Sequence, residues 1–136
     1  MISCITLKET PQDGIYVIRE GVRLVIFFNL VPNKAENEYI GEAVHVDGFE
    51  RKNIIASIIT DKYDQDDTQA ILANYADALY DEHIGGEKKQ EYIAEYNSYQ
   101  EYRDKAKKIA NIVISRLNEL LQKQRSSKIS IYSESV

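Results

Sequence analysis

The acidic residues that begin at Asp64 come closest to a motif that could do chemistry. Asp64-x-Asp66 begins like a calcium-binding loop, which offers oxygen ligands at alternate positions. The later positions do not fit, because Gln69 stands where the loop needs glycine and Tyr75 stands where it needs a bidentate glutamate. Capping of a following helix explains the aspartates better. The sequence therefore predicts no metal site at this position.

Other residues that bind metals or act as nucleophiles are few and scattered. His83 follows Asp81 and Glu82, but adjacent loop residues seldom converge on one ion, and His45 stands alone in a strand. Cys4, the only cysteine, lies in an apolar run where a thiol usually packs as a small hydrophobe. The chain contains neither a Gly-x-Ser-x-Gly turn nor a glycine-rich phosphate loop. We expect no catalytic residue, no cofactor and no small-molecule substrate, and predict a protein that is not an enzyme.

Composition indicates one globular domain of 136 residues with a net charge of −5. This charge gives no support for nucleic-acid binding. The start of the chain lacks the basic region and apolar core of a signal peptide. The longest apolar run covers residues 24–28, far below the roughly 20 residues that a membrane span needs. We therefore expect no membrane association.

The sequence predicts strands in the first part of the chain and helices in the rest, and these elements must position any site. Four segments rich in β-branched and aromatic residues predict strands at 2–7, 14–18, 22–30 and 39–46. Glu20-Gly21 predicts a tight hairpin between the second and third strands. Helices are predicted over about 49–63 and 68–79, with Asp47 and then Asp66 or Asp67 as caps. The first helix should cover the sheet through its apolar residues Ile54, Ile55, Ile58 and Ile59.

A third, long helix is predicted over 87–124, with Asn97-Ser98 as the place where it would bend or break. The predicted fold class is α+β: a small antiparallel N-terminal sheet, two short helices and a long C-terminal helix. A single domain would cover 1–124, with a β part at 1–48 and a helical part at 49–124. The serine-rich tail 125–136 is expected to be flexible, with a short strand over 128–132 as an alternative.

The long helix carries a stripe spaced by alternating threes and fours, the period that keeps one face toward a partner helix. We refer to this stripe as the seam, and the predicted interface consists of its eight residues: Tyr96, Tyr99, Arg103, Ala106, Ala110, Val113, Leu117 and Leu120. A straight helix of this length, roughly 55 Å, would exceed the width of the domain, about 30 Å. The seam predicts a homo-oligomer. A monomer would have to bury the seam under its own sheet.

Charge is distributed unevenly along the helical part. The charged residues of segment 61–82 are seven acidic and one basic, whereas those of segment 103–125 are seven basic and two acidic. Two segments of opposite sign can pair within one chain or between neighbouring copies. The alternative is that both are solvated faces, where each exposed ion pair contributes little stability.

Residues 40–112 resemble small uncharacterised proteins from the structural gene clusters of tailed phages and prophages of gut Bacteroidales. The similar elements are the strand 42–47, Lys62-Tyr63, the acidic cap 64–67, Asn74-Tyr75 and the helix 99–110. The resemblance implies a non-enzymatic, self-assembling virion component of the head, neck or tail. Its partners would be itself and other virion proteins, and its location the virion or the host cytoplasm. The alternative is a monomeric adaptor that binds a single protein partner.

Overall fold

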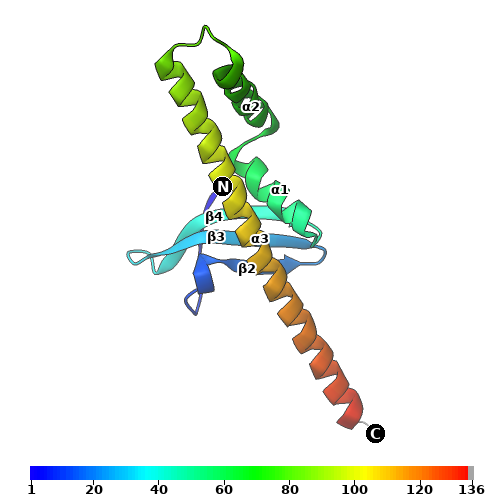
Figure 1. The fold of residues 1–136 in the computed structure, drawn as a ribbon. Helices are drawn as coiled ribbons and strands as arrows, with labels where there is room; N and C mark the ends of the chain where they lie inside the picture. Colours follow the sequence, from blue (N-terminus) through cyan, green and yellow to red (C-terminus); the bar gives the residue numbers. More distant parts are fainter. Residues whose placement is uncertain (135–136) are drawn as a thin grey trace.

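The chain folds as an α+β protein in which helices cross one face of an antiparallel sheet (Figure 1). The computed structural model describes the backbone of residues 1–134 and the side chains of residues 1–120 and 122. The elements are β1 (Ile2–Ile5), the 3-10 turn η1 (Gln12–Gly14), β2 (Tyr16–Glu20), β3 (Arg23–Asn33), β4 (Glu38–Asp47), α1 (Arg51–Lys62), α2 (Gln65–Tyr80) and α3 (Gly86–Glu134). The predicted fold class is confirmed.

The sheet has the strand order β1-β4-β3-β2, and every neighbouring pair is antiparallel. The predicted hairpin between β2 and β3 forms, with Gly21 at a φ of 64°. A register shift interrupts the β3–β4 ladder between Phe28 and Val31, where Asn29 has a φ of 56°. Gly41 lies opposite this bulge, and a Cβ added there would come 2.6 Å from the Phe28 carbonyl oxygen. Glycine is therefore required by the close approach of the two strands.

The main core lies between the sheet and a layer formed by α1 and α3. Leu24, Ile26 and Phe28 alternate along β3 toward the helices and are fully buried. Ile54 and Ile58 of α1 cover them, as the sequence predicts. The middle of α3 shares this task, and its buried residues in the core are Ala106, Ile109, Ala110 and Val113.

A second, smaller cluster lies on the other face of the sheet. It contains Val25, Phe27 and Leu30, with Leu7 and Tyr39 packed against them. Leu7 belongs to the segment that connects β1 to η1, so this connection covers part of the second face. Both faces of β3 are therefore buried, which explains its nearly continuous apolar sequence.

Helix starts differ in detail from the predictions. Glu50, not Asp47, occupies the N-cap of α1. The N-cap of α2 is Asp64, whose carboxylate accepts a hydrogen bond from the Asp67 backbone N–H at 2.7 Å. The Asp67 carboxylate accepts one from the Asp64 N–H in return, which completes a capping box. The aspartates that resemble a calcium loop thus cap a helix.

Helix α3 is longer than predicted. It passes through Asn97-Ser98 without interruption, so the predicted break is absent. It also continues past position 124 to Glu134, and the backbone at 128–132 is helical where the sequence allowed a strand. The side chains of the expected flexible tail, and residues 135–136 entirely, lie outside the described part of the chain.

Candidate protein-interaction surfaces

The predicted interface along α3 falls largely inside the protein. Tyr99, Ala106, Ala110 and Val113 are buried, and the last three belong to the main core. Leu117 is half-buried and packs against the same core. In this fold these residues are not available to a second chain, because the chain's own sheet and α1 already cover them. The expectation that they form an intermolecular seam is corrected accordingly.

Three residues of the predicted interface remain at least partly accessible. Tyr96 and Arg103 are half-buried, and Leu120 is exposed at 53%. Tyr96 contacts α2, where its ring stacks on Tyr75. The seam therefore packs on α2 at one end and on the sheet in the middle.

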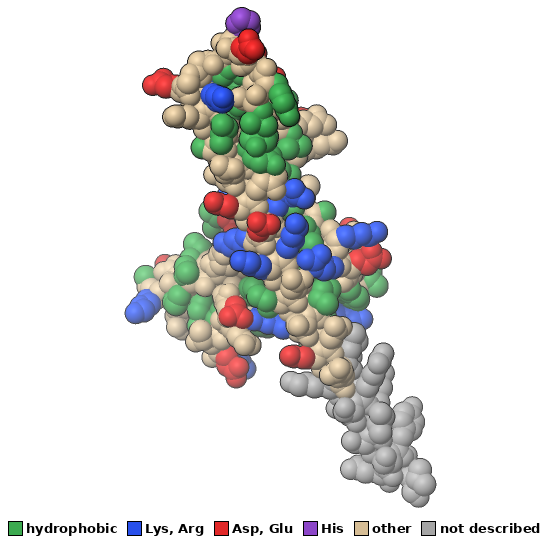
Figure 2. Space-filling model, viewed as in Figure 1, with side chains coloured by type: hydrophobic (Ala, Val, Ile, Leu, Met, Phe, Trp, Pro, Cys, Tyr) green, Lys and Arg blue, Asp and Glu red, His purple; other side chains and the backbone are tan. Residues whose placement is uncertain are grey.

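The antiparallel pair formed by α2 and the first part of α3 projects beyond the sheet (Figure 1). We call residues 64–99 the hairpin. Its exposed large apolar side chains are Leu72 at 45%, Leu79 at 48% and Tyr80 at 83%. Figure 2 shows apolar side chains gathered on the hairpin. Exposed apolar groups that lie together on a projecting element are typical of protein-binding surfaces.

A pattern in α2 could have revealed this surface from the sequence. Apolar residues occur there as the adjacent pairs Ile71-Leu72 and Ala78-Leu79. Neighbouring helical positions point about 100° apart, so only one member of each pair can face α3. Ile71 and Ala78 are the buried members, and both leucines are left exposed.

Basic side chains form a second surface where α3 crosses the sheet (Figure 2). Lys105, Lys107 and Lys108 are exposed, whereas Ala106 and Ile109 between them face the core. Arg51 of α1 adds a further basic side chain beside α3, where its Nε donates a hydrogen bond to Asn111 Oδ1 at 2.7 Å. We call Lys105, Lys107 and Lys108 the basic face.

The described residues form no ion pair between the acidic segment 61–82 and the basic segment 103–125. Lys107 instead lies 4.0 Å from Asp104 on its own helix, and Asp61 pairs with the amino group of Met1.

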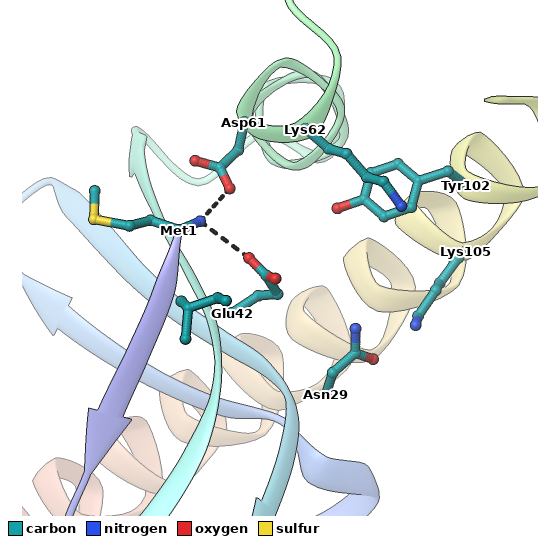
Figure 3. Close-up of a pocket in the computed structure, with 8 residues that line it drawn as sticks. Met1, Asn29, Glu42, Asp61, Lys62, Tyr102 and Lys105 are labelled. Atoms are coloured by element: carbon teal, nitrogen blue, oxygen red, sulfur yellow. Dashed lines mark hydrogen bonds and ion pairs between the residues drawn. The ribbon is translucent and has the colours of Figure 1, made fainter.

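A pocket of about 370 Å³ lies beside the basic face, between α1, α3 and the sheet (Figure 3). The Met1 ammonium pairs with Glu42 Oε2 at 3.0 Å and with the Asp61 carboxylate, which links β4 to α1. Burial alone would lower the pKa of this amine, but its hydrogen bonds to Asp61 and Glu42 and their negative charges raise the pKa overall. The group therefore stays charged and acts as a tie between two elements.

Tyr102 forms one wall of the same pocket. Burial, followed by the charges of Glu42 and Asp61, raises the pKa of its phenol to about 12. Its hydroxyl donates a long hydrogen bond to the Ile58 carbonyl at 3.5 Å, and the Lys62 ammonium lies 4.5 Å from its ring centroid. The phenol is thus neutral at physiological pH.

The remaining candidates for chemistry are separated. Cys4 is exposed on β1, contrary to the expectation that its thiol is packed. His45 is exposed on β4, whereas His83 lies in the loop that follows α2, where its backbone N–H donates to Asp81 Oδ1 at 2.9 Å. Within the described residues, no group of three or more histidine, cysteine or acidic side chains could hold a metal ion.

Comparison with known proteins adds no relative: no protein-family model, no curated protein and no solved structure matches this chain. None of the helices in the described part of the chain combines the length and the apolarity that crossing a bilayer requires.

Proposed function

We propose that this chain is a non-enzymatic, self-assembling structural protein that makes its intermolecular contacts through the hairpin. The observation that carries the proposal is the exposure of Leu72, Leu79 and Tyr80 on an element that stands clear of the sheet. These exposed side chains do not pack in the core of their own chain, so contact with another protein would give them a role. Leu72 and Leu79 are already about half covered, so burying the rest of either side chain against another protein would contribute about 1 kcal/mol.

The length of α3 supports the same proposal. Its 49 residues correspond to about 74 Å, and both ends extend beyond the sheet in Figure 1. A helix that extends past its own core on both sides is suited to bridging neighbouring molecules. Because the resemblance described above points to tailed phages, we propose the virion as the setting of this assembly, with other virion proteins as further partners.

The test is sedimentation equilibrium across a concentration series. The wild-type chain should show a mass above that of one chain, and Leu79→Asp with Tyr80→Asp should reduce it toward a single chain. Val22→Asp is the matched control, because Val22 is 73% exposed in the β2–β3 turn, away from the hairpin. A wild-type mass that equals one chain at every concentration would reject self-assembly.

A monomeric adaptor is the second candidate function. The burial of Ala106, Ala110 and Val113 favours it, because a monomer is expected to cover the seam with its own sheet. In that case the hairpin would bind a different protein. A wild-type chain that stays monomeric, but binds other virion proteins through Leu79 and Tyr80, would support this function instead.

A further inference from the structure

We propose that two copies pair with their α3 helices antiparallel, so that the acidic hairpin of each copy lies on the basic face of the other. This inference rests on the proposed self-assembly and specifies its geometry. It makes the contact reciprocal and closed, with a two-fold axis between the two α3 helices. Closed two-fold dimers are the commonest form of soluble homo-oligomer.

The two surfaces carry strongly opposite charge. The hairpin has nine acidic and two basic side chains, a net charge of −7. The segment of α3 from 103 to 116, which contains the basic face, has five basic residues and one acidic residue, a net charge of +4. Pairing hairpin with hairpin would bring two strongly negative surfaces together. Pairing hairpin with basic face replaces this repulsion by attraction.

The two surfaces cannot satisfy each other within one chain. Both include parts of the same continuous helix, and they lie one after the other along its axis (Figures 1 and 2). A straight helix cannot fold back to join them. A second copy in antiparallel orientation brings each hairpin beside the partner's basic face, and both contacts then form at once.

The position of the two-fold axis follows from the same spacing. The α3 part of the hairpin runs from 86 to 99, and the basic segment runs from 103 to 116. Their midpoint falls near residue 101, where Glu101 is exposed. Side chains near Glu101 should therefore meet their own symmetry mates. Residues far from this point, such as the exposed Glu119, should lie far from theirs.

Charge reversal on each surface tests the pairing. The face variant changes Lys105, Lys107 and Lys108 to Glu. The hairpin variant changes Asp66, Asp77 and Glu82 to Lys, and it spares Asp64 and Asp67 because these form the capping box of α2. All six positions are exposed, so the fold should be retained, as checked by circular dichroism.

Each variant alone should dimerise at least about tenfold more weakly than the wild type at low salt. The face variant sets a segment of −2 against a hairpin of −7, and the hairpin variant leaves a hairpin of only −1 against the segment of +4. An equimolar mixture of the two should form a mixed dimer, because one of its two contacts again joins a hairpin of −7 to a basic segment of +4. A chain that carries all six changes has surfaces of −1 and −2 and should stay a weak dimer. Lys8→Glu with Lys34→Glu is the control, because these exposed lysines lie outside both surfaces. Dimers should also weaken with added salt, since the Debye length at physiological ionic strength is about 8 Å.

Cysteine cross-linking in a Cys4→Ser background tests the orientation. Glu101→Cys should form a disulfide dimer under mild oxidation, and Glu119→Cys should not. Equal cross-linking at both positions would mean parallel helices and would overturn the proposal. A face variant that dimerises as well as the wild type would also overturn it, although self-assembly through the hairpin would stand. A wild-type chain that never exceeds one chain in mass would reject both.

Discussion

The ring of Tyr75 on α2 lies parallel to the ring of Tyr96 on α3, with 3.7 Å between centroids and 6° between planes. This stack joins the two helices of the hairpin at mid-height, between the buried Ile71 and Ala78. Nearly superposed rings are less favourable electrostatically than offset or edge-on pairs. The contact therefore stabilises the hairpin mainly through the apolar area that it buries.

A double-mutant cycle should measure this contact. Tyr75→Leu and Tyr96→Leu each retain a large apolar side chain while removing one ring. We expect a coupling free energy of about 0.5 kcal/mol, the lower end for aromatic pairs, because the rings are not offset. Urea unfolding of the four proteins supplies the free energies. A coupling of 2 kcal/mol or more would mean that the stack itself holds the hairpin together.

The second prediction concerns the main core. Ile58→Ala should lower the free energy of unfolding by about 2–5 kcal/mol, because the Ile58 side chain is fully buried between the sheet and α3. Thr60→Ala on the same helix is the control. Its hydroxyl bonds only to carbonyls of its own helix, so a change within about 0.5 kcal/mol is expected. Equal effects of the two substitutions would contradict the assignment of α1 as the cover of the sheet.

The third prediction concerns Arg116, whose role the sequence did not reveal. Its guanidinium donates hydrogen bonds to the carbonyl oxygens of Ile15 and Gln12, at 2.5 and 2.7 Å, which ties α3 to the turn before β2. Arg116→Met should cost about 1.5–3 kcal/mol in the free energy of unfolding, the range for hydrogen bonds to charged groups.

Asp13→Asn is the matched control for Arg116. Asp13 contributes only an ion pair with Arg116 at 3.6 Å and is well exposed. Asparagine also tolerates the left-handed φ of 59° at this position. A loss below about 1 kcal/mol is therefore expected. If Asp13→Asn costs as much as Arg116→Met, the ion pair and not the carbonyl contacts holds the turn.

The fourth prediction is a loss of stability at alkaline pH that depends on Tyr102. The folded chain holds the phenol proton up to a pKa of about 12, whereas the unfolded chain releases it near its ordinary value of 10. The free energy of unfolding therefore decreases as pH rises from 10 to 12, because the unfolded state releases the proton first. Tyr102→Phe should remove this part of the pH dependence. Because Tyr102 is only half-buried, the effect should be on the order of 1 kcal/mol. Identical slopes between pH 10 and 12 for both proteins would contradict it.

Much of the fold could be predicted because local patterns and packing agree. The apolar run of β3, the turn at Gly21 and the isoleucines of α1 each indicate the element that the structure contains. Element ends were less accurate, since Glu50 caps α1 although Asp47 is the better capping residue by type. Helix α3 also keeps its hydrogen bonds through Asn97-Ser98, because packing on α2 and the sheet outweighs weak propensity.

The candidate surfaces were harder to predict for a physical reason. A stripe such as Ala106, Ala110 and Val113 shows that one helix face is covered, but a sheet and a second helix produce the same stripe. Whether a sheet or another helix covers the stripe depends on contacts between residues far apart in the chain. Arg116 illustrates the same limit, because its partners Gln12 and Ile15 lie more than one hundred positions away.

Helix α3 also makes the hairpin and the sheet layer mechanically continuous. No hinge separates them, since the same backbone hydrogen bonds run from Gly86 past Ala106 without interruption. The tip of the hairpin, where His83 lies, is about 30 Å along this lever from the core position at Ala106. A rotation of only about 5° at the core would thus displace the tip by roughly 3 Å. Small changes in the orientation of α3 on the sheet would therefore move the tip of the hairpin by several ångströms, while the hairpin itself moved as a rigid body.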